Sequence, residues 1–227
     1  MSVTVSVCQS NYIPWKGYFD LIKSSDIFVV YDHVQYTKND WRNRNLIKSN
    51  QGLKWLTIPV SQSRLGQKIN ETEISYGKWN IKHWKTLKSN YSRSPFFKEY
   101  SEYFEELYLS SGSNFISEIN QKFLKSLLDL LEIKTKVILS SNFKNVSDKN
   151  ENLLNILLEL NATEYLSGPS AKDYIDEKLF TNNGINVKYI DYTNYQSYTQ
   201  LHGKFEHGVS ILDLIFNVGL KEINKYY

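Results

Sequence analysis

Ile27-Phe28-Val29-Val30-Tyr31 is a continuous apolar run with the length of one strand, and it is the strongest indication of the fold class. Such runs are typical of strands that are buried on both faces of a parallel sheet. Upstream, Val3, Val5 and Val7 alternate with polar residues and predict a first strand. Residues 17–22 space their apolar groups as a short helix does. The start of the chain is therefore predicted to be a strand, a helix and a strand.

The remaining chain continues the alternation of strands and helices. The patterns predict strands at 53–60, 136–140, 164–168 and 187–192, helices at 84–91, 96–109, 115–131, 152–160, 173–180 and 211–216, and loops at 32–50 and 61–80. This order indicates an α/β fold with a largely parallel, Rossmann-like sheet flanked by helices. We expect one domain over residues 1–227, with a helical insertion near residues 80–135.

Composition excludes several classes of protein. The chain has 227 residues, of which 41% are hydrophobic and 22% are charged, as in globular proteins rather than disordered or fibrous ones. Cys8 is the single cysteine, so no intramolecular disulfide can form. The first ten residues do not resemble a signal peptide, and no run of about 20 apolar residues predicts a membrane span. We therefore expect a cytoplasmic protein.

Arginine is scarce, and this makes its position informative. Lys and Arg together number 27, but only Arg42, Arg44, Arg64 and Arg93 are arginine. Two of the four stand in Trp41-Arg42-Asn43-Arg44-Asn45. Guanidinium groups bind phosphate or carboxylate through two parallel hydrogen bonds, which lysine cannot reproduce. The segment predicts an anion clamp; the alternative is structural ion pairs with Asp32 or Asp40.

Three segments leave the carboxyl ends of predicted strands, where ligands bind in open α/β sheets. They are residues 9–18, 32–38 and 167–170, and all are rich in groups that form hydrogen bonds or stack. The first could instead be a rigid turn with aromatic packing. The third, Ser167-Gly168-Pro169-Ser170, precedes a predicted helix and resembles an anion-binding helix start, although one glycine does not make a phosphate loop.

The standard motifs of phosphate loops, dinucleotide-binding folds, zinc peptidases and serine hydrolases are missing from the sequence. The four histidines, His33, His83, His202 and His207, do not have the spacing of metal ligands, so we expect no metal site. Cys8 would be a nucleophile only with a base such as His33 beside it; a small buried apolar residue is the simpler interpretation. The net charge of +3 comes from scattered lysines and does not require a nucleic-acid partner.

Taken together, these segments resemble the WbqC-like protein family over nearly the whole chain. The resemblance rests on Q-S-N-Y-I-P-W-K-G-Y-F-D-L-I (9–22), D-I-F-V-V-Y-D-H-V-Q-Y-T-K (26–38), W-R-N-R-N-L-I (41–47), W-L-T-I-P-V (55–60), Y-L-S-G (165–168) and S-I-L-D-L-I-F-N-V-G (210–219). Two positions depart from the family pattern. Ser10 replaces a usual proline and relaxes the turn, and His33 replaces a frequent acidic residue.

The resemblance implies a transferase of surface-polysaccharide biosynthesis, of the kind that builds O-antigen in lipopolysaccharide. An acyl or aminoacyl (glycyl-like) group would move onto the amine of a nucleotide-activated amino sugar. Such a reaction needs a base and an oxyanion donor. Asp32 is the candidate base, and Gln9, Asn11 and Gln35 are candidate oxyanion donors.

Binding roles are a hypothesis from side-chain chemistry and from the position of these segments at strand ends. Arg42 and Arg44 would hold the diphosphate, and Trp15, Tyr18 or Trp41 would stack on the base. The other expected substrate-binding residues are Tyr36, Lys38, Asn43, Ser167 and Gly168. The partners would be a nucleotide-linked sugar and an activated acyl donor, with charged tRNA left open as that donor.

The sequence also allows other hypotheses about the function. No cofactor is evident from the motifs, although ATP could activate the acyl group as an adenylate. A glycosyltransferase would also need a sugar-nucleotide site, but its usual D-x-D metal motif is missing. A non-catalytic module that binds a sugar intermediate is the third reading.

Overall fold

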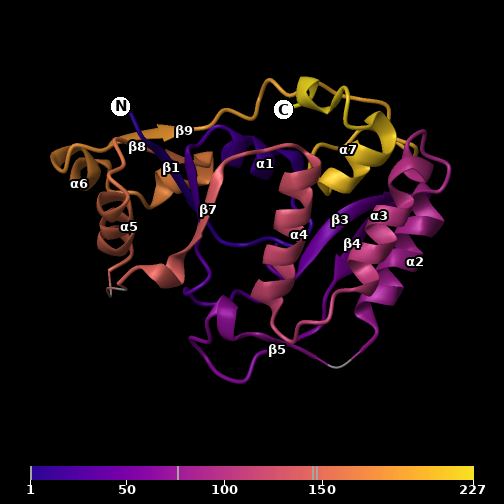
Figure 1. Cartoon of the computed structure of the whole chain (residues 1–227), viewed down its shortest axis with the longest axis horizontal. Coiled ribbons are helices and arrows are strands. Elements are labelled where there is room, and N and C mark those ends of the chain that lie inside the picture. Colours follow the sequence, from indigo (N-terminus) through magenta and orange to yellow (C-terminus); the bar gives the residue numbers. More distant parts are fainter. Residues whose placement is uncertain (1, 76, 145, 147) are drawn as a thin grey trace.

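The computed structural model describes residues 2–75, 77–144, 146 and 148–227, and its centre is a five-stranded parallel sheet in the order β7-β2-β1-β8-β9 (Figure 1). The strands are β1 (Thr4–Cys8), β2 (Ile27–Val30), β7 (Lys136–Leu139), β8 (Glu164–Ser167) and β9 (Asn186–Tyr189). The α/β prediction with a parallel, Rossmann-like sheet is therefore confirmed. The chain first builds β1, β2 and β7 outward and then returns to β8, so the order reverses between β1 and β8.

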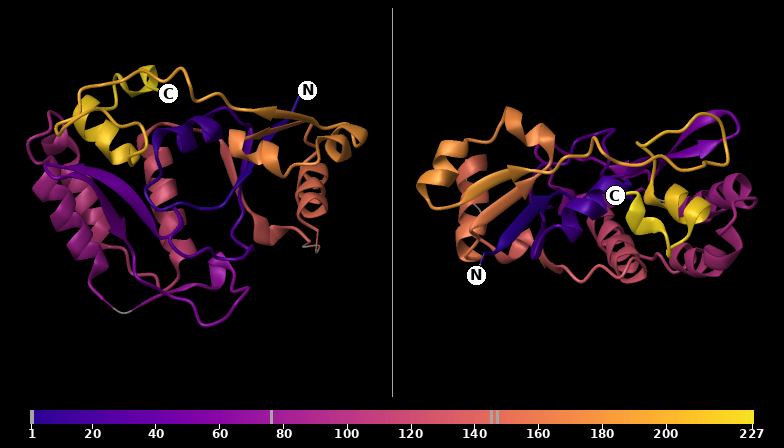
Figure 2. Two further views of the ribbon diagram at one scale, coloured as in Figure 1. Left: turned by 180° about the vertical axis from the view of Figure 1, so that it is seen from behind. Right: turned by 90° about the horizontal axis from the view of Figure 1, so that it is seen from above.

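Helices cover both faces of the sheet. They are α1 (Lys16–Lys23), α2 (Trp79–Tyr91), α3 (Phe97–Leu109), α4 (Ile116–Leu130), α5 (Lys149–Glu159), α6 (Glu177–Asn182) and α7 (Ile211–Val218). Strand residues alternate between the faces, so Phe28 and Val30 join one hydrophobic cluster with α1, α4 and α7. Val5 and Val29 join a second cluster with α5 and α6. Figure 2 shows α5 and α6 on one side of the molecule and α2, α3 and α7 on the other.

The predicted loop at 32–50 is wrong in its second half, because it contains a strand. β3 (Arg44–Ser49) pairs antiparallel with β4 (Gly52–Thr57), outside the main sheet. Asn45 and Ile47 lie on the inward face of this hairpin and are 2% and 0% exposed. The apolar alternation is hidden in the sequence because an asparagine occupies an inward position. Its Nδ2 donates to the backbone oxygens of Tyr12 and Ile13, both at 3.0 Å.

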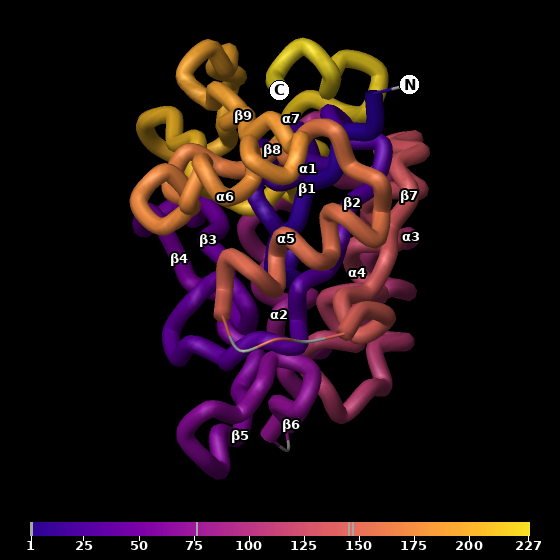
Figure 3. Tube along the Cα trace, turned by 90° about the vertical axis from the view of Figure 1, so that its left-hand side faces the viewer, coloured from indigo at the N-terminus to yellow at the C-terminus, as the bar shows by residue number. Residues whose placement is uncertain are grey.

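The segment between β2 and β7 also holds a second, shorter hairpin and three helices. After the hairpin, β5 (Val60–Ser61) pairs with β6 (Glu73–Ile74) at the end of the molecule opposite both termini (Figure 3). The expected helical insertion follows as α2, α3 and α4. In the part of the chain that the structure describes, no helix is long and apolar enough to cross a membrane.

Candidate functional site

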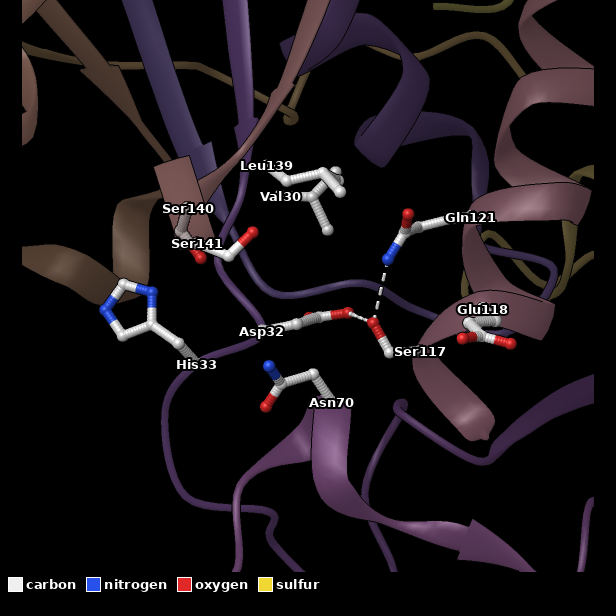
Figure 4. Close-up of a pocket in the computed structure, with 10 residues that line it drawn as sticks. All are labelled: Val30, Asp32, His33, Asn70, Ser117, Glu118, Gln121, Leu139, Ser140 and Ser141. Atoms are coloured by element: carbon white, nitrogen blue, oxygen red, sulfur yellow. Dashed lines mark hydrogen bonds between the residues drawn. The ribbon is translucent and has the colours of Figure 1, made fainter. Parts of the chain in front are cut away.

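A cavity of about 290 Å³ lies at the carboxyl ends of β2 and β7, against the start of α4 (Figure 4). We call it the polar cavity, because hydroxyl, amide and carboxylate groups form most of its wall. Its lining residues are Val30, Asp32, His33, Asn70, Ser117, Glu118, Gln121, Leu139, Ser140 and Ser141. These residues include two carboxylates and no lysine or arginine, so the cavity suits a hydroxyl-rich ligand that carries an ammonium group.

Asp32 stands directly after the buried strand β2 and is fixed from two other segments. Its Oδ1 accepts the backbone N–H of Ser10 at 2.8 Å, and its Oδ2 accepts the hydroxyl of Ser117. Gln121 Nε2 in turn donates to Ser117 Oγ at 2.9 Å, as the dashed lines of Figure 4 show. The residue is 4% exposed. Asp32 is therefore held in one orientation at the wall of the polar cavity.

His33 is also buried in this wall. Asn152 Nδ2 donates to His33 Nε2 at 3.0 Å and to the Tyr31 hydroxyl at 2.6 Å. The Tyr31 and His33 rings meet edge to face, with centroids 4.8 Å apart. These contacts give His33 a packed, hydrogen-bonded position in the wall of the polar cavity.

A second cavity, of about 310 Å³, lies beside the loop that follows β1. We call it the aromatic cavity; its lining residues are Asn11, Trp15, Trp41, Asn45 and Gly208. The Trp15 ring folds over the start of α1, where Gly17 leaves room for it: a Cβ on residue 17 would stand 2.3 Å from Trp15 Cζ2. The Trp41 ring packs on Trp55 at a centroid distance of 5.4 Å.

The two arginines of the predicted clamp have protein partners. Arg42 Nη2 forms an ion pair with Asp40 Oδ2 at 2.8 Å, and its Nη1 donates to Asn11 Oδ1 at 2.9 Å. The Arg44 guanidinium lies 4.1 Å from the centre of the Trp55 ring, and its Nη2 donates to the Asn39 backbone oxygen at 2.5 Å. Arg42 thus forms the ion pair with Asp40 that the sequence left open, and the structure brings it against Asn11 of the aromatic cavity.

A buried asparagine of α4 links the loop after β1 to the segment that holds Arg42. Asn120 is 0% exposed, and its Nδ2 donates to Ser10 Oγ at 3.0 Å and to the Arg42 backbone oxygen at 2.8 Å. Because the Ser10 N–H also donates to Asp32, one network of hydrogen bonds runs from the polar cavity to the backbone of Arg42. Sequence reasoning missed Ser117 and Asn120. The available signal was a polar residue, Asn120, within the apolar stripe of a predicted helix.

Other predicted site residues line neither cavity. The Tyr18 hydroxyl donates to the Gln9 backbone oxygen at 3.0 Å, and its ring packs in the core against Phe28. Gln35 and Lys38 are exposed. Tyr36 is 2% exposed, and burial raises the pKa of its hydroxyl to about 12.

The third strand-end loop lies near the aromatic rings that follow β9. A Cβ added to Gly168 would lie 3.9 Å from the Tyr192 hydroxyl, and the Tyr192 ring packs on Trp15 at 4.9 Å. Ser167 Oγ accepts the Tyr165 hydroxyl at 3.1 Å. Asn43 is buried, with its Nδ2 donating to the Ile58 oxygen at 2.8 Å.

Cys8 ends β1 below these loops. Burial raises the pKa of its thiol, and the nearby Arg42 charge acts in the opposite direction with a smaller effect. A protonated thiol is a poor nucleophile. Over the residues that the structure describes, no group of three or more His, Cys, Asp and Glu side chains is placed to hold a metal ion.

Comparison with known proteins places the chain in a family. Residues 9–225 match the model described as the WbqC-like protein family. A relative from Mycobacterium tuberculosis, named "Uncharacterized protein Rv1507c", is 46% identical over 216 residues, which cover 95% of this chain and 94% of the relative. No solved structure matches the chain. Because the family model covers almost the full length, the chain belongs to the WbqC-like protein family.

Proposed function

We propose that this protein is a transferase of surface-polysaccharide biosynthesis, such as O-antigen assembly. It would transfer an acyl or aminoacyl group onto the amine of a nucleotide-linked amino sugar. The observation that supports the proposal most is the pair of cavities at the strand ends. One is aromatic and the other is polar and acidic, and residues 10 and 11 of one loop connect them.

The aromatic cavity supports the nucleotide part of the proposal. Trp15 and Trp41 supply two indole rings for a nucleobase, and stacking on an aromatic side chain stabilises a bound base by about 1–3 kcal/mol. Asn11 adds an amide to the wall. A volume of about 310 Å³ is at the lower end of the range for small-molecule sites, which fits one part of a larger ligand.

The polar cavity supports the amine part. Asp32 and Glu118 give it negative charge without a neighbouring cation in its wall, which favours an ammonium group. Asn70, Gln121 and three serines offer hydrogen bonds to sugar hydroxyls. An amino sugar has both kinds of group, whereas a phosphate would be repelled here.

The chemistry needs one proton acceptor and one oxyanion donor. The bound ammonium first releases one proton to water. The neutral amine nitrogen then attacks the acyl carbonyl carbon, a C–N bond forms, and the carbonyl oxygen becomes negative. The activating group then leaves with its electron pair, and the proton of the amine passes to Asp32. Asn70 and Gln121, rather than Gln9 and Gln35, are the amides that line this cavity and would donate to the oxyanion.

The test is a transfer assay with the purified protein. Nucleotide-linked amino sugars are incubated with activated acyl and aminoacyl donors, with and without ATP, and products are identified by mass. Asp32→Asn keeps an acceptor for the Ser10 N–H, so we expect a folded variant. Its rate should fall by at least about 100-fold. The control is Asp129→Asn, an exposed carboxylate on α4 that is 67% exposed in its side chain.

Three results would contradict the proposal in whole or in part. One is an Asp32→Asn variant with the rate of the unchanged protein, which would remove Asp32 from the reaction. Another is no product from any donor while the nucleotide-linked sugar binds, which would favour a binding module. A product whose mass has grown by a sugar would instead identify a glycosyltransferase.

A further inference from the structure

Strand β7 is one edge of the main sheet, and its outer side carries peptide groups that β2 does not use. The Lys136 N–H donates to the backbone oxygen of Asp26, just before β2, at 3.2 Å. Peptide groups alternate in direction along a strand, so Ile138 also points toward β2, whereas the N–H and C=O groups of Val137 and Leu139 point away from it. Among the described residues, no strand pairs with β7 on that outer side. The edge therefore offers two residues whose peptide groups are directed at another strand.

An apolar groove lies along this edge. A cavity of about 360 Å³ is enclosed between β7 and α4 (Figure 1), and we call it the edge groove. Its lining includes Leu124 and Leu128 of α4 and Val137 and Leu139 of β7. Val137 and Leu139 are 39% and 36% exposed. Large aliphatic side chains exposed beside an open strand edge are typical of a surface that another chain covers.

The opposite edge of the sheet, β9, differs from β7 in its charges. Lys188 stands inside β9 and pairs with Glu164 of β8 at 2.5 Å. A lysine inside an edge strand opposes the addition of a further strand. In β7 the charged residue is Lys136 at the first position, and residues 137–139 are all apolar. Of the two edges, β7 is therefore the one suited to strand pairing.

A second copy of this chain matches the edge by symmetry. Two β7 strands related by a two-fold axis across the sheet run antiparallel, and each presents the same surface to the other. With the axis at Ile138, Val137 of each copy lies opposite Leu139 of the other. These residues have the outward peptide groups, and directly opposed residues of an antiparallel ladder exchange two hydrogen bonds. This register also brings the exposed side chains of Val137 and Leu139 together beside the edge groove.

The charges at the rim of the groove fit the same arrangement. Lys125 and Asp129 of α4 line the edge groove and form an ion pair at 3.2 Å. Their side chains are 82% and 67% exposed, so both are free to turn toward a neighbouring molecule. A two-fold axis brings one charge of each sign from each copy to the interface, so the copies meet without an excess of either charge.

We propose that two copies of this chain form a dimer by pairing their β7 strands, with Ile138 at the two-fold axis, so that the two sheets become one. This inference is independent of the proposed function. It nevertheless concerns the candidate site, because Val30, Gln121 and Leu139 line both the edge groove and the polar cavity. The second copy lies beside that site and covers one side of its wall.

Sedimentation velocity over a range of protein concentrations tests the dimer. We expect the unchanged protein to sediment with twice the 26.6 kDa of one chain. Val137→Lys and Leu139→Lys each place a charge in the edge of both copies, so each should raise the dissociation constant at least about 100-fold. Leu158→Lys, at an aliphatic residue of α5 that is 43% exposed, is the matched control and should stay dimeric.

Disulfide cross-linking tests the register. The two Ile138 residues form a pair without hydrogen bonds, whose Cα atoms lie about 4.5 Å apart, and a disulfide spans that distance. Ile138→Cys should therefore give a covalent dimer on mild oxidation. In Val137→Cys the two cysteines are diagonal neighbours about 7–8 Å apart, which is too far for a disulfide. The unchanged protein, which has Cys8 alone, gives the background.

Four results would overturn the inference. A monomer at every concentration refutes the dimer and leaves the edge groove to a strand of another protein. A dimer that both lysine variants leave intact, or that Leu158→Lys weakens equally, refutes the β7 interface. A cross-link in Val137→Cys but not in Ile138→Cys refutes the register. If the lysine variants fail to fold, a dimeric Ile138→Cys protein that does not cross-link refutes the pairing.

Discussion

Replacing Gly17 with alanine tests whether the Trp15 ring lies over the start of α1. An alanine Cβ there would stand 2.3 Å from Cζ2 of Trp15, 2.6 Å from Cη2 and 2.7 Å from Cε2. Carbon atoms in contact lie about 3.5–4.0 Å apart, so the ring must move by about 1 Å or more. Such a movement disturbs its packing on the Tyr192 ring and changes one wall of the aromatic cavity.

Two opposing effects determine how much Gly17→Ala changes the free energy of unfolding. Alanine is favoured over glycine in a helix by at most about 1 kcal/mol. Forcing a side chain out of a packed position costs about 1–3 kcal/mol. We therefore expect Gly17→Ala to lower the free energy of unfolding by about 1–2 kcal/mol, which in a chain of this length lowers Tm by about 2–8 °C.

The assay is thermal and urea unfolding of Gly17→Ala, Trp15→Ala and the double variant. Without the ring the alanine meets no clash, so Gly17→Ala should be neutral or stabilising in the Trp15→Ala background. Gly112→Ala is the control, because a Cβ there meets nothing within 4 Å. The described position of Trp15 would be refuted if Gly17→Ala raised the free energy of unfolding, and raised it equally with and without the Trp15 ring.

Two further predictions concern pH and ligand binding. Burial lowers the pKa of His83 to about 4 from 6.5, so the unfolded chain binds a proton below pH 6.5 that the folded protein does not. The free energy of unfolding should fall by about 2 kcal/mol between pH 6.5 and about pH 5, and urea unfolding of His83→Gln should lack this slope. Trp41 is 40% exposed, so Trp41→Ala should lower Tm by only a few degrees while weakening nucleotide binding in calorimetry about tenfold. The control is Leu53→Ala, at a residue of the same region that is 48% exposed; an equal loss of affinity there would contradict the stacking role.

The main sheet could be predicted from the sequence because each strand has a local signature. A run such as 27–31 excludes water on both faces, and the alternation of strands and helices leaves few topologies. β3 was missed because Asn45 faces inward, where two backbone oxygens of the loop after β1 accept its amide. That pairing joins segments far apart in the chain, so no local pattern could show it.

Some residues of the candidate site could be predicted from the sequence, because they follow directly after predicted strands. The rule that ligands bind at strand ends led to Asp32, Asn11 and Trp15, and each lines a cavity. The partner of Asp32, Ser117, is 85 residues away in the sequence. The neutralisation of Arg42 by Asp40 decides which cations remain for a ligand, and the sequence alone left that choice open.

The pairing of β2 with β7 has a consequence for how the chain folds. Ile27 pairs with Lys136, so the whole insertion with its hairpins and helices must be accommodated before these strands align. Closing a long loop costs entropy before any contact is gained, and pairings of this kind slow folding. During synthesis β2 emerges long before β7, and its outer edge stays open for pairing with other chains. We therefore expect the yield of folded protein to depend on temperature and concentration during refolding more strongly than its final stability would indicate.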